Sequence, residues 1–543
     1  MADIKATKIL IIGGGFAGVY TAMELERLLK GDPSVEINLV SKENYIVFQP
    51  MLPEVISGAI GLTDVISPIR RLCPRTNLFT RPVESIDLAK KRVTAGSGFD
   101  SREYYLSYDH LVIAVGNLTS FAGESGLMEH AVPFKTLGDG LVLRNHVIHA
   151  MEEADIEQDP EIRRALLTFV IGGGGFSGVE AIAELNDFVR ISAKHFRNIN
   201  PKEIRTVLLH SGPLILPELP ESLARYAQDL LGKRGVEVMV KTRLQGATAG
   251  YALLSNGERI PTRTLVSTVP STANPLVNDL PVKKEKGRIV VNQFLEVPDA
   301  PGLWAAGDCA WIIDPETGEP HPPTAQHAIR EARCLARNIV ATLRVGSKKP
   351  FHFHALGKLG ALGHQRAVAE MFGIRLGSNR FTSFVAWFLW RFIYLMKMPG
   401  LDRKVRVAVG WFLDLILGAD IVQLRTERGA SIRREHFEGG ETIFREGDRG
   451  DRVYVIVDGE IDILRAAPGG GETLVRRLVQ GETFGEIALV RDMPRTAAAR
   501  SVSKVNLLSM DRETFQTLFA TMPPLRRLFE ELIDSRIGAV TPR

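Results

Sequence analysis

The glycine pattern G-x-G-x-x-G occurs twice in this chain and constrains its fold more than any other feature. It stands at Gly13, Gly15 and Gly18, and again 160 positions later at Gly173, Gly175 and Gly178. Each copy follows an apolar run typical of a buried parallel strand and leads into a helix-like segment. Such a turn lets the backbone approach a pyrophosphate at a helix N-terminus. The repeat predicts an α/β fold with two Rossmann-like dinucleotide-binding domains.

Two dinucleotides in one chain predict hydride transfer between them. A flavin enzyme that uses a nicotinamide cofactor has this logic. Phe16 and Ala17 adjoin the glycines of the first loop, and Gly116 ends the strand-like run YDHLVIAVG. The alternative is a duplicated fold in which one of the two loops binds nothing.

The residue after the second strand of each module departs from the usual pattern. A dinucleotide fold commonly places an acid there, which binds the ribose hydroxyls. The first module has Ser41, with Glu43 close by as a substitute, and the second module has His210. An imidazole cannot accept the ribose 2′-OH hydrogen bond as a carboxylate does, but it tolerates a 2′-phosphate. The sequence therefore predicts weak discrimination between NADH and NADPH.

A carboxylate follows the strand-like part of GLWAAGDCA. At this place Asp308 can accept a hydrogen bond from a ribityl hydroxyl of FAD. A turn or helix N-cap aspartate is the plainer alternative. The company of two glycine loops favours the flavin role.

Charge and cysteine content exclude several function classes. The net charge is +4, which gives no global signal for nucleic acid. The three cysteines, Cys73, Cys309 and Cys334, form no C-x-x-C pair, so a disulfide reductase is disfavoured and a reduced cytoplasmic setting is expected. The N-terminus has no signal-peptide pattern.

Residues 381–398 are unusually aromatic and read as an amphipathic helix. Apolar side chains keep helical spacing at Phe381, Phe384, Val385, Phe388, Phe392 and Leu395. Trp387, Trp390 and Tyr394 suit a membrane interface, and Arg391 and Lys397 can reach lipid headgroups. The run is too short to span a bilayer. We therefore expect peripheral docking on an anionic membrane surface at its cytoplasmic face, with a dimer interface or a buried helix as the alternative.

The pattern changes again near the C-terminus. Residues 426–434 read as a polar linker, and short strands with glycine turns follow them, as in an all-β domain. The segment FGEIALVRDMPRTAAA resembles the phosphate-binding cassette of cyclic-nucleotide-binding domains. The resemblance implies a β-roll with flanking helices and a site made of Gly485, Glu486, Ala488, Arg495 and Thr496.

The chemistry of these residues suits a cyclic nucleotide. Arg495 and the backbone at Gly485 would hold the cyclic phosphate, and Glu486 would accept a hydrogen bond from the ribose 2′-OH. We favour cAMP weakly over cGMP. The alternative is a folded domain that binds no nucleotide.

Residues 8–425 resemble the type II NADH:quinone oxidoreductases, within the flavoproteins that have two dinucleotide-binding domains. The resemblance rests on NYIVFQPMLPEV, YDHLVIAVG, GGGFSGVEAIAEL, GLWAAGDCA and PPTAQHAIRE. It implies FAD on the first loop, at a site that includes Phe16, Ala17 and Gly116, and NADH or NADPH on the second loop. It also implies electron transfer from NAD(P)H through FAD to a membrane quinone without proton pumping. It also implies that Gln326, next to Ala325, lines the quinone pocket and that Glu180 lies near the flavin. A first-turn helix acid is the plainer reading of Glu180.

These features divide the chain into five parts. We expect an FAD-binding domain at 1–130 and 285–350, an NAD(P)H-binding domain at 131–284, a membrane-docking and quinone-site region at 351–425, a linker at 426–434 and the cyclic-nucleotide-binding domain at 435–543. The alternative functions are a cyclic-nucleotide-responsive redox signalling flavoprotein and a sulfide:quinone-type oxidoreductase. The sequence leaves a homodimer open.

Overall fold

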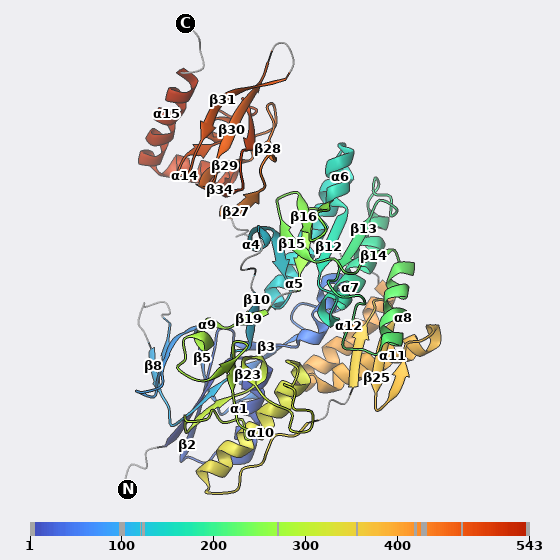
Figure 1. Ribbon diagram of the computed structural model, residues 1–543, viewed down its shortest axis with the longest axis vertical. Helices are drawn as coiled ribbons and strands as arrows, with labels where there is room; N and C mark the ends of the chain where they lie inside the picture. Colours follow the sequence, from blue (N-terminus) through green and yellow to red (C-terminus); the bar gives the residue numbers. More distant parts are fainter. Residues whose placement is uncertain are drawn as a thin grey trace.

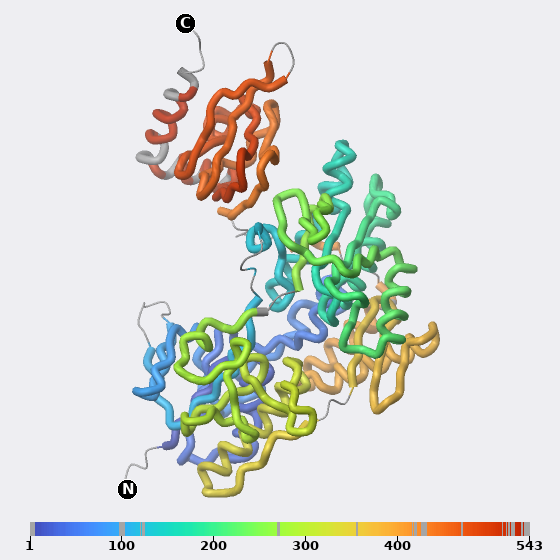
Figure 2. The backbone as a smooth tube through the Cα atoms, in the orientation of Figure 1, coloured from blue at the N-terminus to red at the C-terminus, as the bar shows by residue number. Residues whose placement is uncertain are grey.

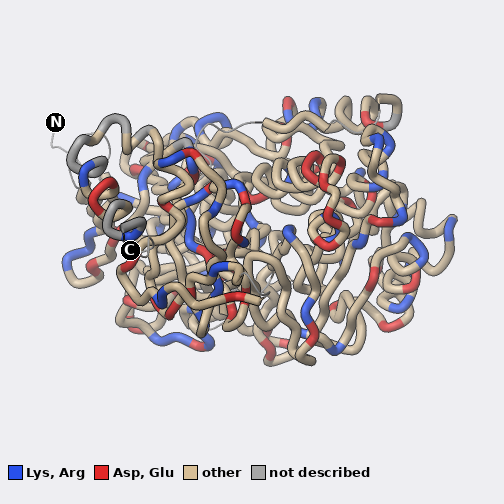
Figure 3. Tube along the Cα trace, turned by 90° about the horizontal axis from the view of Figure 1, so that it is seen from above, with Lys and Arg blue, Asp and Glu red and all other residues tan. Residues whose placement is uncertain are grey.

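The computed structural model describes residues 6–96, 104–119, 121, 125–268, 271–353, 357–417, 421–424, 432–467 and 471–538. Figure 1 shows a lower unit that contains α1 and α10, a second unit around α7 with the helical region of α11 beside it, and the C-terminal domain at the top. Figure 2 shows that the first unit combines early and later parts of the chain, in blue and in yellow-green. Basic and acidic residues are interspersed along the chain (Figure 3).

The first glycine loop belongs to a five-stranded parallel sheet. In spatial order its strands are β22 (Leu303–Ala305), β9 (His110–Ile113), β1 (Thr7–Ile12), β2 (Val35–Ser41) and β5 (Asn77–Thr80). Helix α1 (Phe16–Leu29) packs against β1 and β2 and lies along α10 (Ala325–Leu343). Residues 9–12 are at most 2% exposed, because a parallel strand is covered on both faces.

Small sheets and helices surround this sheet. They comprise β3 (Tyr45–Val47), β4 (Ile66–Pro68), α2 (Pro53–Ser57), α3 (Ile69–Leu72), β6 (Val83–Asp87), β7 (Arg92–Ala95), β8 (Tyr104–Ser107), α9 (Pro275–Asn278), β20 (Lys284–Glu285), β21 (Arg288–Val290) and β23 (Ala310–Trp311).

The second glycine loop belongs to a second parallel sheet of the same kind. Its strands are, in spatial order, β11 (Ala131–Pro133), β18 (Thr264–Ser267), β12 (Thr168–Gly172), β13 (Arg205–Leu209) and β14 (Val236–Met239). The helices of this unit are α4 (Leu127–His130), α5 (Leu137–Ile156), α6 (Pro160–Leu166), α7 (Phe176–Ser192) and α8 (Glu221–Lys233). An antiparallel sheet of β15 (Leu244–Ala247), β16 (Tyr251–Leu254) and β17 (Arg259–Pro261) completes it. The two sheets confirm the α/β class.

The chain crosses between the two units at a pair of antiparallel strands. These are β10 (Asn117–Thr119) and β19 (Ser271–Ala273). Helix α9, which follows β19, already contacts β6 of the first unit. The crossings therefore lie nearer 119 and 271 than the expected 130 and 284, because apolar patterning locates strands but not the hinge between them.

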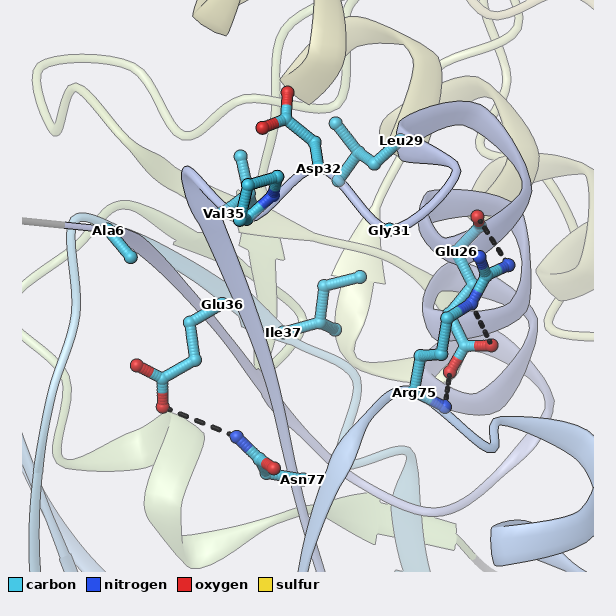
Figure 4. A pocket seen from close by; sticks show the side chains of 11 residues that line it. Ala6, Glu26, Leu29, Gly31, Asp32, Val35, Glu36, Ile37, Arg75 and Asn77 are labelled. Carbon is cyan, nitrogen blue, oxygen red and sulfur yellow. Dashed lines mark hydrogen bonds and ion pairs between the residues drawn. The ribbon is translucent and has the colours of Figure 1, made fainter. Parts of the chain in front are cut away.

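A surface hollow of about 300 Å³ lies at the amino ends of β1, β2 and β5 (Figure 4). Several of its polar groups are paired with each other: Glu26 accepts from the Arg75 N–H at 2.9 Å, and Asn77 donates to Glu36 at 3.4 Å. The glycine loop lies at the opposite, carboxyl edge, where ligands of open parallel sheets bind. No predicted site residue lines the hollow.

Two helices after a small sheet form the region predicted to dock on a membrane. The sheet contains β24 (Gly357–Ala361), β25 (Ala367–Met371) and β26 (Ile374–Leu376), and the helices are α11 (Arg380–Lys397) and α12 (Leu401–Leu417). Large apolar side chains one helical turn apart are between 42% and 75% exposed, at Phe381, Phe384, Phe388 and Phe392 on α11 and at Val405, Val409, Phe412 and Ile416 on α12. No helix within the described ranges is long and apolar enough to cross a membrane.

The structure corrects the prediction that the tryptophan, tyrosine and cationic side chains of α11 lie at a membrane interface. Trp390 is 2% exposed and belongs to the core, and Tyr394 packs edge-on against it. Arg391 does not reach outward, because it pairs with the buried Glu54 at 3.4 Å. Lys397 is half-buried. Helical spacing identified two faces correctly, but it could not show that this aromatic and cationic face meets the flavoprotein core.

The C-terminal domain consists of two four-stranded antiparallel sheets and three helices. One sheet has β27 (Ile432–Phe437), β34 (Val505–Asp511), β29 (Arg452–Asp458) and β32 (Thr483–Phe484), and the other has β28 (Thr442–Phe444), β33 (Ala498–Ser501), β30 (Ile461–Ala466) and β31 (Glu472–Leu478). The helices are α13 (Glu486–Val490), α14 (Arg512–Thr521) and α15 (Pro523–Gly538). Residues 432–434 of the expected linker begin β27, and residues 425–431 lie outside the described residues.

Candidate functional site

The two glycine loops have nearly identical backbones. Gly13 and Gly173 have φ of +117° and +122°, a region that favours glycine. A Cβ on Gly18 or Gly178 would stand 1.8 Å from the carbonyl oxygen of the first glycine of its own loop. Both patterns therefore form the tight strand-to-helix turn that the sequence predicted.

The space in front of the first loop fits the pyrophosphate of FAD. No atom lies within 4 Å of an ideal Cβ on Gly15 or on Gly116. Gly15 is the N-cap of α1 and provides no side-chain cap, so amide N–H groups at this helix start are left for a ligand. Phe16 and Ala17 are buried at the same helix start.

Asp308 lies in a buried electrostatic network near this loop. Its turn is fixed by a hydrogen bond of 2.7 Å from the Gly307 N–H to Glu331. Burial raises the pKa of Asp308, and the nearby Lys135 and Arg288 oppose that increase. A carboxylate held between two cations can accept a hydroxyl hydrogen bond, as the predicted ribityl contact requires.

Ser41 and Glu43 occupy different environments. Ser41 is buried beneath the loop, so close that a Cβ on Gly14 would meet its Oγ at 2.1 Å. Glu43 is exposed two residues later. The serine therefore supports the turn, and the exposed Glu43 is the acid available near this edge.

His210 fills the corresponding place beside the second loop. A Cβ on Gly174 would stand 2.6 Å from its Cγ, and one on Gly212 would stand 2.7 Å from its Nε2. Burial lowers the pKa of His210, although a backbone hydrogen bond at Leu214 opposes the shift. The imidazole is therefore neutral at pH 7 and carries no acceptor equivalent to a carboxylate.

One cavity of about 590 Å³ is bordered by both modules. Phe16 and Tyr20 of α1 line it, together with Phe176 and Glu180 of α7 and Gln326 of α10. Helix α11 contributes Ile393, Tyr394, Met396 and Lys397. The cavity therefore links the two glycine loops to the helix whose other face is exposed and apolar. Five cations and one acid line it, namely Lys135, Arg330, Arg333, Lys358, Lys397 and Glu180.

Glu180 is a buried acid on the wall of this cavity. Its Oε1 accepts hydrogen bonds from the Ala361 N–H at 2.9 Å and from the Trp390 indole at 3.2 Å. Burial raises its pKa to about 8 despite these two donors. The carboxyl is therefore protonated at pH 7, and the proton belongs on Oε2, because Oε1 is already an acceptor.

The N-terminus of α10 also opens into the cavity. Its N-cap, Thr324, does not cap the helix, since its hydroxyl contacts His327 Nδ1 at 2.7 Å. Ala325 and Gln326 form the first turn, and the Gln326 amide is held at 3.5 Å from the Gly357 carbonyl. Uncapped N–H groups favour negative charge or a polar oxygen in the cavity.

The C-terminal domain has its own pocket of about 210 Å³, lined by all five residues of the predicted cassette site. Glu486 and Arg495 are 1% and 3% exposed. Glu486 Oε2 and Arg495 Nε have no hydrogen-bond partner, although both are buried. Buried polar atoms usually have partners, so these two atoms are suited to a polar ligand.

The remaining polar atoms of these two side chains are already held. Glu486 Oε1 accepts from Arg536 of α15 at 2.6 Å, and Arg495 Nη1 donates to the Gly485 carbonyl at 2.6 Å. Ala488 is buried on α13, and Thr496 borders the pocket beside Arg495. Glu486 Oε2 and Arg495 Nε are thus buried, unpartnered atoms of two side chains that line the pocket.

Comparison with known proteins matches both parts of the chain. Residues 7–332 match the family model described as "Pyridine nucleotide-disulphide oxidoreductase", and residues 434–522 match "Cyclic nucleotide-binding domain". A type II NADH:quinone oxidoreductase of Mycobacterium tuberculosis is 30% identical over 75% of this chain and 87% of its own length. The demethylphylloquinone reductase of Synechocystis is 30% identical over 76% of this chain and 96% of its own length.

The chain belongs to the type II NADH:quinone oxidoreductases. It is an oxidoreductase with a cyclic-nucleotide-binding domain fused at its C-terminus. NDH2 from Plasmodium falciparum, solved in complex with NADH, has the same fold, with a TM-score of 0.70 and 18% identity over 77% of this chain and 99% of that one.

The cysteines distinguish this oxidoreductase from the sulfide:quinone type considered above. All three are free, and burial raises the pKa of Cys73 and Cys309 to about 12. A thiol with such a pKa is a poor nucleophile, because the reactive form is the thiolate. Cys309 therefore reads as a core residue of the GDCA turn.

Several groups in this site were missed by sequence reasoning. Lys135 faces Asp308, Glu331 fixes the Gly307 turn, and Trp390 holds Glu180. Arg536 holds Glu486 from α15. The partners of each pair are far apart in the sequence, and no local motif shows the pairing. Trp390 was expected at a membrane interface and Glu331 ends the segment PPTAQHAIRE, but neither pattern indicated the role found here.

Proposed function

We propose that this chain oxidises NADH or NADPH with FAD on the first loop and reduces a membrane quinone without pumping protons. The observation that carries the proposal is the shared cavity, which both glycine loops and α11 border. A nicotinamide and a quinone can therefore reach one reaction centre from different sides.

FAD suits the first module because the loop has open space, uncapped N–H groups and a nearby polar network around Asp308. When bound, FAD accepts a hydride from the nicotinamide and passes two electrons to the quinone. Burial raises the pKa of Asp308, and the charges of Lys135 and Arg288 oppose that rise and favour the carboxylate that would accept from the ribityl chain. The five cations of the cavity attract phosphate groups and polar quinone oxygens.

Glu180 supports quinone reduction as a proton-holding group. Converting a quinone to a quinol consumes two protons, and oxidation of NADH releases only one. Glu180 holds a proton at Oε2 because burial raises its pKa to about 8. A group whose pKa is near the working pH is an effective acid or base. Gln326 supplies an amide at the same wall and orients the quinone carbonyl.

The exposed apolar faces of α11 and α12 support peripheral docking on an anionic bilayer. Phe388 and Phe412 are 63% and 62% exposed, and such a pair of faces would be buried at a membrane surface. Flotation with anionic liposomes tests this. Phe388→Glu with Phe412→Glu should leave the chain in the soluble fraction. Recovery with the liposomes equal to wild type would refute docking by these faces.

The free atoms Glu486 Oε2 and Arg495 Nε support binding of a cyclic nucleotide that regulates the enzyme. The ribose 2′-OH donates to Glu486 Oε2, and the cyclic phosphate accepts from Arg495 Nε. Titration calorimetry with cAMP and cGMP tests the site. Arg495→Ala should abolish the heat of binding, and unchanged binding would refute the assignment.

The whole proposal is tested by steady-state oxidation of NADH and of NADPH by a soluble quinone, with and without cAMP and cGMP. The purified protein should be yellow and contain FAD. Gln326→Leu should raise KM for the quinone about tenfold while KM for NADH stays unchanged, because one polar contact is lost. A colourless protein that cannot be reconstituted with FAD would refute the proposal.

A further inference from the structure

The C-terminal domain contacts the second dinucleotide module directly, through a joint that we define as Ser125, His130 and His436. His130 Nε2 lies 2.8 Å from the backbone nitrogen of His436 on β27 and 3.0 Å from the His436 carbonyl oxygen. The His436 ring lies 3.1 Å from the Ser125 hydroxyl through Nε2. Burial lowers the pKa of His130 to about 4, so its ring is neutral at this contact.

The joint is tightly packed on both sides. A Cβ on Gly126 would stand 1.9 Å from the Ala247 carbonyl oxygen and 2.9 Å from His436 Cδ2. Ala249, which lies between β15 and β16, packs against the hydrophobic core of the C-terminal domain. There is therefore little free space around β27 at this contact, and a displacement of β27 would also displace α4.

Hydrogen bonds connect the nucleotide pocket to this joint. Arg495 Nη2 donates to the Arg452 carbonyl at 2.8 Å. The Arg452 side chain donates to the Ser509 hydroxyl at 3.0 Å, and Ser509 donates to Glu435 on β27. Glu435 precedes His436, so β27 carries the network from Arg495 to the joint.

On its other side, the joint lies a few residues before the wall of the cavity that both modules border, which we call the flavin cavity. His130 ends α4 and is followed by β11, which is part of the second sheet. Phe134 and Lys135 follow β11 and line the cavity. Lys135 Nζ donates to the Asn117 carbonyl at 2.5 Å, and its charge acts on Asp308. A movement of α4 is therefore transmitted to the cavity wall by a short, sheet-bound segment.

We propose that a cyclic nucleotide at Arg495 acts on the flavin cavity through the contact between β27 and α4. This inference rests on the proposed nucleotide regulation and names its route. The rival route runs through residues 421–424, which follow α12 and are tied to α5 by two hydrogen bonds between the Asn145 side chain and the Leu424 backbone, at 2.8 and 3.0 Å. That contact touches neither the nucleotide pocket nor the cavity.

The test measures coupling in the full, FAD-loaded chain. Calorimetry gives the affinity for cAMP and cGMP with and without NAD⁺, and hydrogen exchange reports on residues 125–135. In wild type, NAD⁺ should change nucleotide affinity about fivefold or more, in the range typical of coupled sites. The nucleotide should also change exchange in residues 125–135.

Three variants separate the two routes. His130→Ala should still bind the nucleotide but reduce the NAD⁺ effect to less than about twofold, the level of uncoupled sites, and remove the exchange response. Ser509→Ala breaks the network inside the C-terminal domain and should do the same. Asn145→Ala is the matched control, because it removes two hydrogen bonds from the same module at the rival route, and it should behave as wild type.

Each outcome decides between supporting and overturning the route. Full coupling in His130→Ala, or loss of coupling in Asn145→Ala alone, overturns it while the nucleotide site stands. Nucleotide binding in wild type without any NAD⁺ effect or exchange change also overturns it. An absence of nucleotide heat in wild type refutes the proposed ligand itself, and the inference falls with it. That last result differs from a failed route, because it appears before any variant is made.

Discussion

The two dinucleotide modules have the same loop but present different groups to the cavity they share. With Gly18 matched to Gly178, Phe16 corresponds to Phe176, and all of these positions lie 160 residues apart. The second residue after the last glycine also points to the cavity in both modules. It is a tyrosine, Tyr20, in the first module and Glu180 in the second.

The difference shows how one fold serves two purposes. The loops are almost fixed by backbone sterics, because φ at their first glycines is nearly equal. The two helix positions are not fixed in this way. In both, burial raises the pKa, but a buried phenol stays neutral in any case, whereas a buried carboxyl holds a proton that it would otherwise lose. The two modules thus share the glycine loop for a dinucleotide but differ in the side chain, Tyr20 or Glu180, that lines the cavity.

The largest effects should come from breaking each loop separately. Gly18→Ala should abolish FAD binding, and Gly178→Ala should abolish NADH binding while FAD is retained. In each case a Cβ would stand 1.8 Å from a backbone oxygen. Flavin absorbance and NADH titration measure the two losses. Gly232→Ala is the control, because nothing lies within 4 Å of its Cβ on α8. Loss of FAD from Gly178→Ala would contradict the assignment of the loops.

Removing the proton-holding group should have the next largest effect. Glu180→Gln keeps the acceptor for Ala361 and Trp390 but has no exchangeable acid, so quinone turnover should fall about a hundredfold. NADH affinity should stay unchanged, which separates a chemical role from a structural one. Glu180 is the fifth residue of α7 and lies beyond its first turn, so the first-turn reading is wrong. An unchanged turnover number would show that its carboxyl has only a structural role.

The same variant gives a pH signature in stability. The pKa of Glu180 is raised from 4.5 to about 8 in the folded chain. The folded state therefore holds a proton that the unfolded state has lost, and this contribution is full below pH 4.5 and is lost as pH rises through about 8. Tm of Glu180→Gln relative to wild type should increase between pH 5 and pH 8.5. A constant difference would show that the carboxyl is not buried in the neutral form.

Changing His210, the residue beside the second loop, should have a smaller effect, on the choice between NADH and NADPH. His210→Glu introduces a carboxylate acceptor for the ribose 2′-OH and should shift preference toward NADH about tenfold, the usual strength of one charged hydrogen bond. The ratio of kcat/KM for NADH and NADPH measures it. Strong NADH preference in wild type would show that the neutral His210 does not decide the choice.

Sequence reasoning reached the parts of this molecule that are local in the chain. Gly13 to Gly18, the GLWAAGDCA turn and the cassette at Gly485 depend on neighbouring residues, so their patterns predicted the observed turns. Trp390 and Arg391 were placed wrongly, because helical spacing shows that two faces exist but not which neighbours bury them. The pairing of Glu180 with Trp390 spans 210 residues, and packing alone brings these side chains together.

The smallest effect should come from the counterpart of Glu180 in the first module. The Tyr20 hydroxyl makes one long hydrogen bond, to the Lys397 carbonyl at 3.5 Å, and the ring fills the cavity wall beside Phe16. Tyr20→Phe removes the hydroxyl and keeps the ring, so quinone turnover should change by less than about threefold, since such a bond contributes little. A decrease as large as that of Glu180→Gln would mean that Tyr20 also holds a proton for the quinone, and the two modules would then be chemically alike.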